Sequence, residues 1–367
     1  MLCRVAGLAL ACVLLIAGTA EAVIGGKRAR PAEYPWIGNF RACTSTLIAP
    51  DRVMTAAHCV AAVGSQMPTI TFGSERRRAV NMAIHPAWVS GALAPGRQSP
   101  PPDDVAIVQL DQPLTGVAPI ALQTGPLTDG AEVHIFGAGQ SRPPSPEQRE
   151  DDFGRPGSLR TAELAVLGDG RCGRTWRRQR GNSGERFSAV RMLCAGDPDG
   201  RRPLRAGCLG DSGGPLVVRE GDQWVLAGVT SWGSDSCGAD GAPTVFAEVG
   251  RYLEFVRNVD PVWMPLASGP ATMTGSARPG ETLTCKAPAW HNEPDRVAYG
   301  FTSALESGRD PIMVQAGSRS TYRVKASDAG RYITCAAQGM NAGGLDESPP
   351  AEDARVQDSD SVLSGLE

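Results

Sequence analysis

The chain has 367 residues, with 36 Lys and Arg against 39 Asp and Glu and a formal net charge of −3. This length favours two domains. The near balance of charge gives no reason to expect a nucleic acid or an anionic membrane surface as a partner.

The first 22 residues have the pattern of a secretory signal peptide. After a positively charged start, the apolar run 5–16 is too short to span a bilayer, and Ala20-Glu21-Ala22 matches a small-x-small cleavage site. Removal of residues 1–22 would take Cys3 and Cys12 with it and leave eight cysteines, an even number that favours disulfides in an exported protein. We therefore expect a secreted, extracellular protein that does not span a membrane.

Two polar residues in the first half of the chain are candidates for chemistry. Thr55-Ala56-Ala57-His58-Cys59 places a histidine beside a cysteine that can fix its loop, and Asp104 begins the apolar run Asp104–Ile107. Asp103 is the neighbouring rival, and we expect it to face solvent. Taken singly, such a histidine is more often structural, and an aspartate after prolines is more often a loop or cap residue.

A third candidate stands in Cys208-Leu209-Gly210-Asp211-Ser212-Gly213-Gly214-Pro215, where glycines let a carbonyl carbon approach a serine closely. A serine hydroxyl is a weak nucleophile that needs a general base, with an oriented carboxylate behind that base. His58 and Asp104 supply these residue types upstream, in the chain order His, Asp, Ser. At these residues the sequence resembles the chymotrypsin/trypsin family of serine endopeptidases.

The resemblance implies an all-β protease domain of two barrels, which hydrolyses protein or peptide substrates through an acyl-enzyme. His58 would take the proton of Ser212, and Asp104 would orient His58. The backbone N–H groups of Gly210 and Ser212 would form the oxyanion hole. Neither a cofactor nor a metal is expected. Short apolar runs split by Gly and Pro agree with a β-rich fold, and Tyr252–Asn258 has the spacing of a C-terminal helix.

Val23-Ile24-Gly25-Gly26 resembles the mature N-terminus of this family, whose α-ammonium pairs with the acid before the nucleophile. That acid is Asp211 here. Because Val23 follows the expected cleavage site directly, we hypothesise that signal peptidase itself creates the activating terminus. Cleavage after Ala17 or Ala20 would instead leave a short activation peptide.

The eight remaining cysteines allow 105 pairings, so their connectivity is open from the residues alone. The resemblance implies pairs of Cys43 with Cys59, Cys172 with Cys194, and Cys208 with Cys237. Cys285 and Cys335 remain to pair with each other. No close Cys/His quartet suggests a metal site.

The substrate pocket is also placed by the resemblance. The position that carries an acid in trypsin-like enzymes is Ala206 here, which disfavours cleavage after Arg or Lys. Thr244 stands where family members with an open pocket commonly have glycine, and it should narrow the pocket for the P1 side chain. We therefore expect small or medium apolar P1 residues. Asp235 and Asp240 are expected to face solvent. Ser231 would also lie near the carboxylate of Asp104. The other pocket and substrate-binding positions are Gly207, Ser231, Trp232 and Gly233.

The expected domain order is a signal peptide (1–22), a protease domain (23–262), a second domain (268–350) and an acidic disordered tail (351–367). The insertions 91–102 and 141–157 are rich in Pro and charge, and we interpret them as surface loops.

The second domain resembles a bacterial immunoglobulin-like β-sandwich. Thr282-Leu283-Thr284 and Tyr332-Ile333-Thr334 alternate as strands do, each beside one of its two cysteines, and Trp290 is the candidate core aromatic. We expect this module to be separated from the protease by Pro265–Pro270 and to be dispensable for chemistry. It would either bind a surface, a polymer or a large protein, or act as a spacer. The rival hypothesis is an inert protease-fold scaffold that acts in adhesion or binding through this module.

Overall fold

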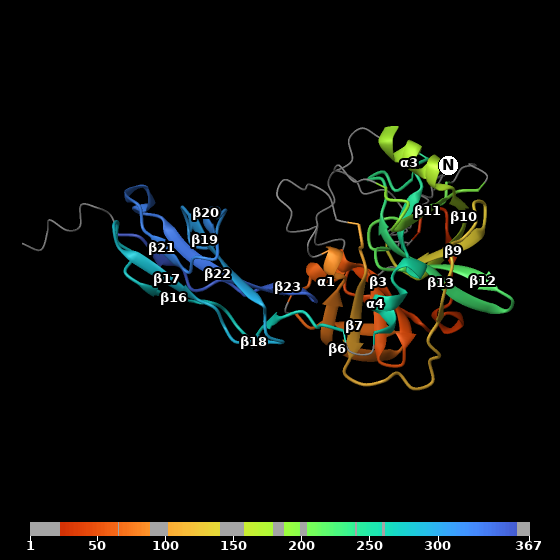
Figure 1. The fold of residues 1–367 in the computed structure, drawn as a ribbon, viewed down its shortest axis with the longest axis horizontal. Coiled ribbons are helices and arrows are strands. Elements are labelled where there is room, and N and C mark those ends of the chain that lie inside the picture. Colours follow the sequence, from red (N-terminus) through yellow and green to blue (C-terminus); the bar gives the residue numbers. More distant parts are fainter. Residues whose placement is uncertain are drawn as a thin grey trace, which may run out of the picture.

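The computed structural model describes residues 23–64, 66–88, 102–139, 158–178, 187–198, 204–238, 241–258 and 261–357 (Figure 1). The expected signal peptide, almost all of both insertions, Asp240 and residues 358–367 lie outside the described residues. Most of the described elements are strands. None of the described helices is long and apolar enough to cross a membrane.

Six antiparallel strands close into a first barrel in the order β2-β3-β4-β7-β6-β5. Side chains that point inward along these strands are fully buried and form its core, among them Leu47, Val53, Ile70, Met82 and Ile107. The helix α1 (Ala57–Ala61) begins just after β4 and carries His58. The strands are β2 (Ile37–Phe40), β3 (Cys43–Ala49), β4 (Arg52–Thr55), β5 (Thr69–Phe72), β6 (Glu75–Ile84) and β7 (Ala106–Leu110).

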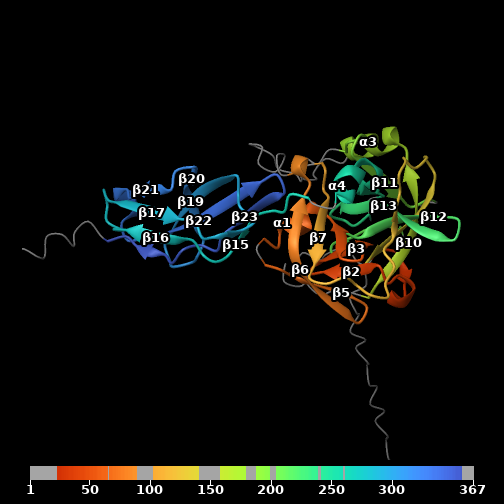
Figure 2. The ribbon, with the colours of Figure 1, turned by 60° about the horizontal axis from the view of Figure 1, so that its bottom comes forward.

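A second ring of six strands lies beside the first in both ribbon views (Figures 1 and 2). Its order is β9-β10-β11-β14-β13-β12, and β12 pairs back with β9. Two short strands join it at the edges, β1 (Lys27–Arg28) on β10 and β8 (Ala121–Leu122) on β13. The expected two-barrel fold is therefore confirmed. The ring strands are β9 (Glu132–Gly137), β10 (Arg160–Leu167), β11 (Met192–Gly196), β12 (Pro215–Glu220), β13 (Gln223–Trp232) and β14 (Thr244–Glu248).

The helix that follows the second ring of strands is α4 (Leu253–Arg257), inside the range expected from the sequence. A longer helix, α3 (Asp169–Arg178), was not expected. Its two glycines and four arginines hide the helical signal, which is carried only by buried Cys172 and Trp176 one turn apart. Single 3-10 turns also occur: η1 (Pro31–Glu33), η3 (Val249–Arg251) and η4 (Ala326–Asp328).

The C-terminal strands form sheets consistent with a β-sandwich. One sheet has the order β16-β17-β21, and the other has β20-β19-β22-β23 with β24 also on β22. A short pair, β15 (Leu266–Ala267) with β18 (Trp290–His291), lies near the junction with the first barrel. The strands of the larger sheets are β16 (Thr272–Gly275), β17 (Thr282–Lys286), β19 (Arg296–Ala304), β20 (Ile312–Gly317), β21 (Thr321–Arg323), β22 (Tyr332–Asn341), β23 (Gly344–Glu347) and β24 (Ala354–Arg355).

All four disulfides expected from the resemblance and by elimination are present: Cys43–Cys59, Cys172–Cys194, Cys208–Cys237 and Cys285–Cys335. The last of these joins β17 to β22 and so links the two C-terminal sheets.

The aromatic residues beside the Cys285–Cys335 disulfide are Phe301 and Tyr322, which stack with ring centroids 5.4 Å apart and are almost fully buried. Trp290 does not occupy this core, because its half-buried ring lies against Gly339 instead.

The prediction of a disordered tail is wrong for residues 351–357. β24 pairs with β22, and Ala351 and Val356 are buried. The N–H of Val356 donates to the carbonyl of Arg331, and the N–H of Gly330 donates back to the carbonyl of Val356. The acidic composition of the whole tail concealed these few apolar residues, which continue the sandwich.

The junction between the two parts is packed rather than a free separator. The N–H of Met264 donates to the carbonyl of Met82, and the N–H of Ile84 donates to the carbonyl of Gly343. These contacts cover the half of β6 that β5 leaves unpaired, because β5 pairs only with Glu75–Arg78. Met264 is buried in the core of the first barrel. Both ribbon views place β23 next to α1 and β6 (Figures 1 and 2), so the expectation of a separate module is wrong at this junction.

Candidate active site

His58 and Asp104 meet at the end of the first barrel. The Nδ1 atom of His58 lies 2.7 Å from Oδ2 of Asp104, and the backbone N–H of His58 donates to Oδ1 at 2.9 Å. Ser231 of β13 donates its hydroxyl to the same Oδ2. Burial by itself would raise the pKa of Asp104, but the charge of His58 and the hydrogen bonds from His58 and Ser231 outweigh burial and lower the pKa. Asp104 is therefore an ionised carboxylate that fixes the ring of His58.

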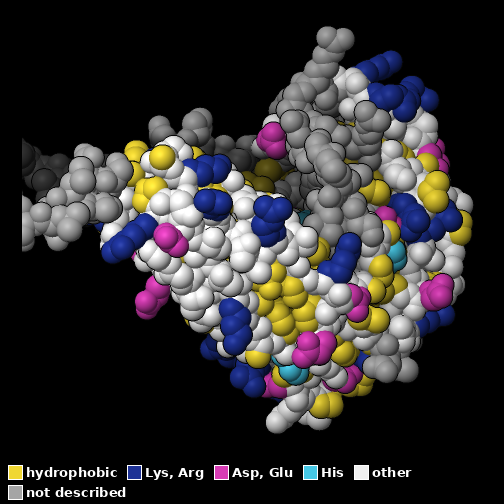
Figure 3. Space-filling model, turned by 60° about the vertical axis from the view of Figure 1, so that its left-hand side comes forward, with side chains coloured by type: hydrophobic (Ala, Val, Ile, Leu, Met, Phe, Trp, Pro, Cys, Tyr) yellow, Lys and Arg dark blue, Asp and Glu magenta, His cyan; other side chains and the backbone are white. Residues whose placement is uncertain are grey.

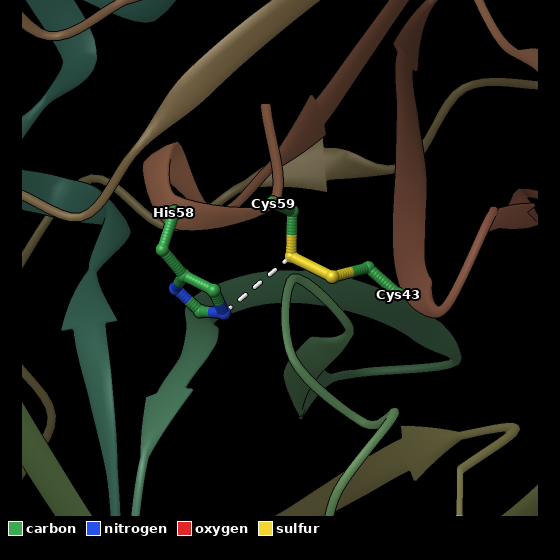
Figure 4. A group of neighbouring side chains, drawn as sticks. All are labelled: Cys43, His58 and Cys59. Atoms are coloured by element: carbon green, nitrogen blue, oxygen red, sulfur yellow. Dashed lines mark hydrogen bonds between the residues drawn. A yellow bond between two sulfur atoms is a disulfide. The ribbon is translucent and has the colours of Figure 1, made fainter. Parts of the chain in front are cut away.

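The other edge of the His58 ring faces a disulfide. Nε2 lies 3.5 Å from Sγ of Cys59, which is bonded to Cys43 (Figure 4). The three side chains are close enough to resemble a metal site. Because both sulfur atoms are held in a disulfide, neither is a thiolate ligand. The cysteine that flanks His58 thus anchors α1 to β3.

Asp103 does not face solvent as expected. It is 4% exposed, its carboxylate is paired with Arg191, and its backbone has a φ of +74°. His85 lies 3.9 Å from the same carboxylate oxygen. Burial lowers the pKa of His85, and the opposing effect of Asp103 is smaller. Asp103 and Asp104 therefore point to different partners: the carboxylate of Asp104 contacts His58, and that of Asp103 pairs with Arg191.

The loop of Ser212 packs against the segment that leads into α1. A Cβ on Gly213, whose φ is +75°, would lie 2.1 Å from Oγ1 of Thr55 and 3.1 Å from the nitrogen of Ala56. Only glycine allows this approach. The N–H of Thr44 also donates to the carbonyl of Ser212. The structure therefore brings the Ser212 loop, from the second barrel, against the residues just before His58.

Two backbone donors in this loop are uncommitted. Within the part of the chain that the structure describes, the N–H groups of Gly210 and Ser212 donate to no protein acceptor. Gly210 has a φ of +91°, and a Cβ there would lie 2.7 Å from Cα of Gly139. Thr44 holds the loop by donating its hydroxyl to the carbonyl of Gly210. Thr44 and Gly139 were not singled out from the sequence, where neither belongs to a motif.

Asp211 is completely buried beneath this loop together with Val23. Its carboxylate accepts backbone hydrogen bonds from Gly139, Cys208 and Val23. Burial raises the pKa of Asp211 to about 7 despite these hydrogen bonds. In the chain that begins at Met1 the Val23 nitrogen is a peptide amide, so no cation from Val23 balances the buried carboxylate.

The expected pocket residues also gather near this loop. Ala206 is buried and forms a two-way backbone bridge with Ile24, and Thr244 accepts a hydrogen bond on Oγ1 from the N–H of Gly207 at 2.9 Å. Trp232 is half-buried and packs on Trp176, with ring centroids 4.5 Å apart. Asp235 is exposed, as expected.

Comparisons with known proteins agree with the two-barrel fold. The family described as Trypsin matches residues 23–256. The solved structure of neuropsin, a serine protease expressed in the limbic system of mouse brain, is 25% identical in sequence and superposes with a TM-score of 0.50. The match covers 64% of this chain and 98% of the neuropsin chain, so the residues beyond the two barrels are largely additional to the fold of that protein.

Proposed function

This chain belongs to the trypsin family of serine proteases, and we propose that it is a secreted endopeptidase in which Ser212, His58 and Asp104 form the catalytic triad. The observation that carries the proposal is the ordered contact between Asp104 and His58, next to the loop of Ser212. Secretion is supported by the signal-like pattern of residues 1–22 and by four disulfides, which persist in oxidising compartments.

In the proposed reaction, the carboxylate of Asp104 keeps the proton of His58 on Nδ1, so that Nε2 is unprotonated and can act as the base. His58 takes the hydroxyl proton of Ser212 as its oxygen attacks the substrate carbonyl. The same imidazole then gives this proton to the leaving amine, and an ester to Ser212 remains. Water hydrolyses the ester by the same steps in reverse order.

The uncommitted N–H groups of Gly210 and Ser212 are the proposed oxyanion hole. A tetrahedral intermediate places a full negative charge on the former carbonyl oxygen, and preorganised donors stabilise that charge without reorganising. Cys208–Cys237 and the hydrogen bond from Thr44 hold the loop in this shape.

We propose that activation follows cleavage directly before Val23. The free α-ammonium would then replace the peptide N–H at the buried carboxylate of Asp211, where a positive charge is needed. Signal peptidase would produce this terminus without a separate propeptide. A start at Gly18 or Glu21, with activity appearing only after a second cut, would contradict direct activation in N-terminal sequencing of the secreted protein.

Reaction with a fluorophosphonate probe tests the enzymatic function against the rival of an inert scaffold. The secreted protein is expected to be labelled covalently, because the probe reports an activated serine nucleophile. Ser212→Ala should abolish the labelling, and Ser74→Ala, a change at an exposed serine, should leave it unchanged. An unlabelled wild-type protein with a mature Val23 terminus would refute the proposal.

For specificity, we propose small or medium apolar P1 residues. Ala206 and Thr244 supply no charge, and burying a lysine without a counter-charge costs several kcal/mol. Ala206→Asp is expected to raise kcat/KM for peptides with Arg or Lys at P1 by about a hundredfold, since leaving a buried charge without its partner costs roughly 2 to 5 kcal/mol. Ala206→Asn is the matched neutral control. Cleavage-site profiling on a denatured proteome compares the P1 preference of the wild type with that of both variants. A wild-type preference for Arg or Lys at P1 would overturn the proposed specificity.

We further propose that the C-terminal strands form an immunoglobulin-like module from about Ser268 to Gln357, with the protease domain spanning 23–262. The two sheets joined by Cys285–Cys335 support this division. Its ligand would be a surface, a polymer or a large protein. On the face shown in Figure 3, cationic and anionic side chains are interspersed.

A further inference from the structure

A closed ring of hydrogen bonds ties the residue before Asp104 to the second barrel. The guanidinium of Arg191, which stands just before β11, donates to the carboxylate of Asp103. The hydroxyl of Tyr252 accepts a hydrogen bond from the backbone N–H of Asp103 and donates to the carbonyl of Arg191 at 3.1 Å. Burial raises the pKa of Tyr252, so the hydroxyl keeps the proton that it donates. Asp103 is thus held at both its side chain and its backbone.

Asp103 needs this restraint because its backbone conformation is unfavourable. A φ of +74° lies in the left-handed region that residues other than glycine seldom adopt, although aspartate tolerates it better than most. The N–H of Val105 donates to the carbonyl of Asp103 at 2.8 Å, which closes a tight turn around Asp104. Such conformations persist where the surroundings over-determine them, often at functional sites. The turn sets the direction in which the carboxylate of Asp104 leaves the backbone.

The position of this ring gives it a consequence for the reaction. His58 and Asp104 come from the first barrel, whereas Ser212 comes from the second. Arg191 also belongs to the second barrel, so its ion pair fixes Asp104 relative to the half of the molecule that carries the nucleophile. The hydrogen bond from Ser231 to Asp104 acts from the same side.

We propose that Arg191 and Asp103 are positioning residues, which hold the strained turn at Asp104 and thereby align the carboxylate with His58. This inference rests on the proposed function, because it assigns these residues to the alignment of the same triad. It predicts an effect on the chemical step, since neither residue is one of the proposed substrate-binding positions and a small misalignment of a catalytic group costs a large part of the rate.

The test compares Arg191→Gln with Arg251→Gln. Arg251 is the matched control because it also pairs with a buried acid of the second barrel, Glu248, and is similarly exposed. Arg191→Gln should lower kcat on a short peptide, and the rate of fluorophosphonate labelling, by tenfold or more with KM unchanged. Arg251→Gln should leave both rates within twofold. Arg191→Lys should recover part of the loss, because it restores the positive charge without the planar guanidinium.

Asp103→Asn provides a second variant that keeps a side chain compatible with the left-handed turn. It should lower kcat, and adding Arg191→Gln should cause little further loss, as expected for partners in one interaction. The low-field proton NMR resonance of His58 Nδ1–H, measured on the same proteins, should weaken or shift in the variants and not in the control. If Arg191→Gln lowers only the thermal stability and leaves both kcat and this resonance unchanged, the pair is merely structural. If the wild-type protein shows the resonance but is not labelled, the proposed function fails. The change of the resonance in the variants then tests by itself whether Arg191 and Asp103 align Asp104 with His58.

Discussion

Replacing Asp104 with asparagine is expected to lower kcat by about ten-thousandfold while the protein stays folded, the size of effect known for this change in the template triad. The backbone N–H of His58 requires an acceptor at the Oδ1 position, so the amide nitrogen must take the place of Oδ2. There it donates to Nδ1 of His58 and forces the ring proton onto Nε2. A protonated Nε2 cannot accept the proton of Ser212.

Steady-state kinetics on a short peptide, together with thermal unfolding, measure this effect. Asp222→Asn is the control, because Asp222 is exposed and contributes only its backbone carbonyl to a described hydrogen bond. A kcat within tenfold of wild type would remove Asp104 from the proposed triad.

Retention of residues before Val23 is expected to make stability fall as the pH rises from about 4 to about 7. In that form burial raises the pKa of Asp211 from 3.8 to about 7. The folded state therefore binds more protons than the unfolded state within this window, and its stability is lost as the pH rises. At 1.36 kcal/mol for each pKa unit, the loss is about 4 kcal/mol. A free α-ammonium on Val23 favours the carboxylate and should remove the decline.

This prediction is checked by thermal unfolding from pH 4 to pH 7 of two proteins, one starting at Val23 and one with residues before it. Both carry Ser212→Ala so that neither cuts itself. Identical pH profiles would show that the terminus does not pair with Asp211. In the active mature form, Asp211→Asn should lower kcat by about a hundredfold or more, comparable to the loss of one oxyanion donor.

The sequence was most informative where function depends on a few adjacent residues. The segments around His58 and Ser212 combine a reactive side chain with the glycines or cysteine that position it. A short contiguous segment was therefore enough to predict each of these two residues. The contact between Asp104 and His58 joins residues 46 apart, and it was predictable only through the resemblance.

Features that depend on distant partners were missed. Asp103 looked like a solvated acid, because the partner that buries it, Arg191, is 88 residues away. Helix α3 shows only Cys172 and Trp176 as an apolar stripe, and its stability comes from packing against the rest of the second barrel. β24 is too short to stand out from an acidic segment, and it forms because β22 offers an edge.

The four disulfides determine which parts of the molecule come apart together. Each bridge lies within one barrel or within the C-terminal sandwich, and all eight cysteines after residue 22 are used in this way. No disulfide therefore crosses the seam between the barrels, which are joined there by non-covalent contacts and by the connecting chain. Local opening costs less free energy than global unfolding, and no disulfide limits opening at this seam. We therefore expect urea to abolish activity at a lower concentration than the concentration that unfolds the barrels. When the urea is diluted, the two disulfide-linked barrels would only have to re-associate.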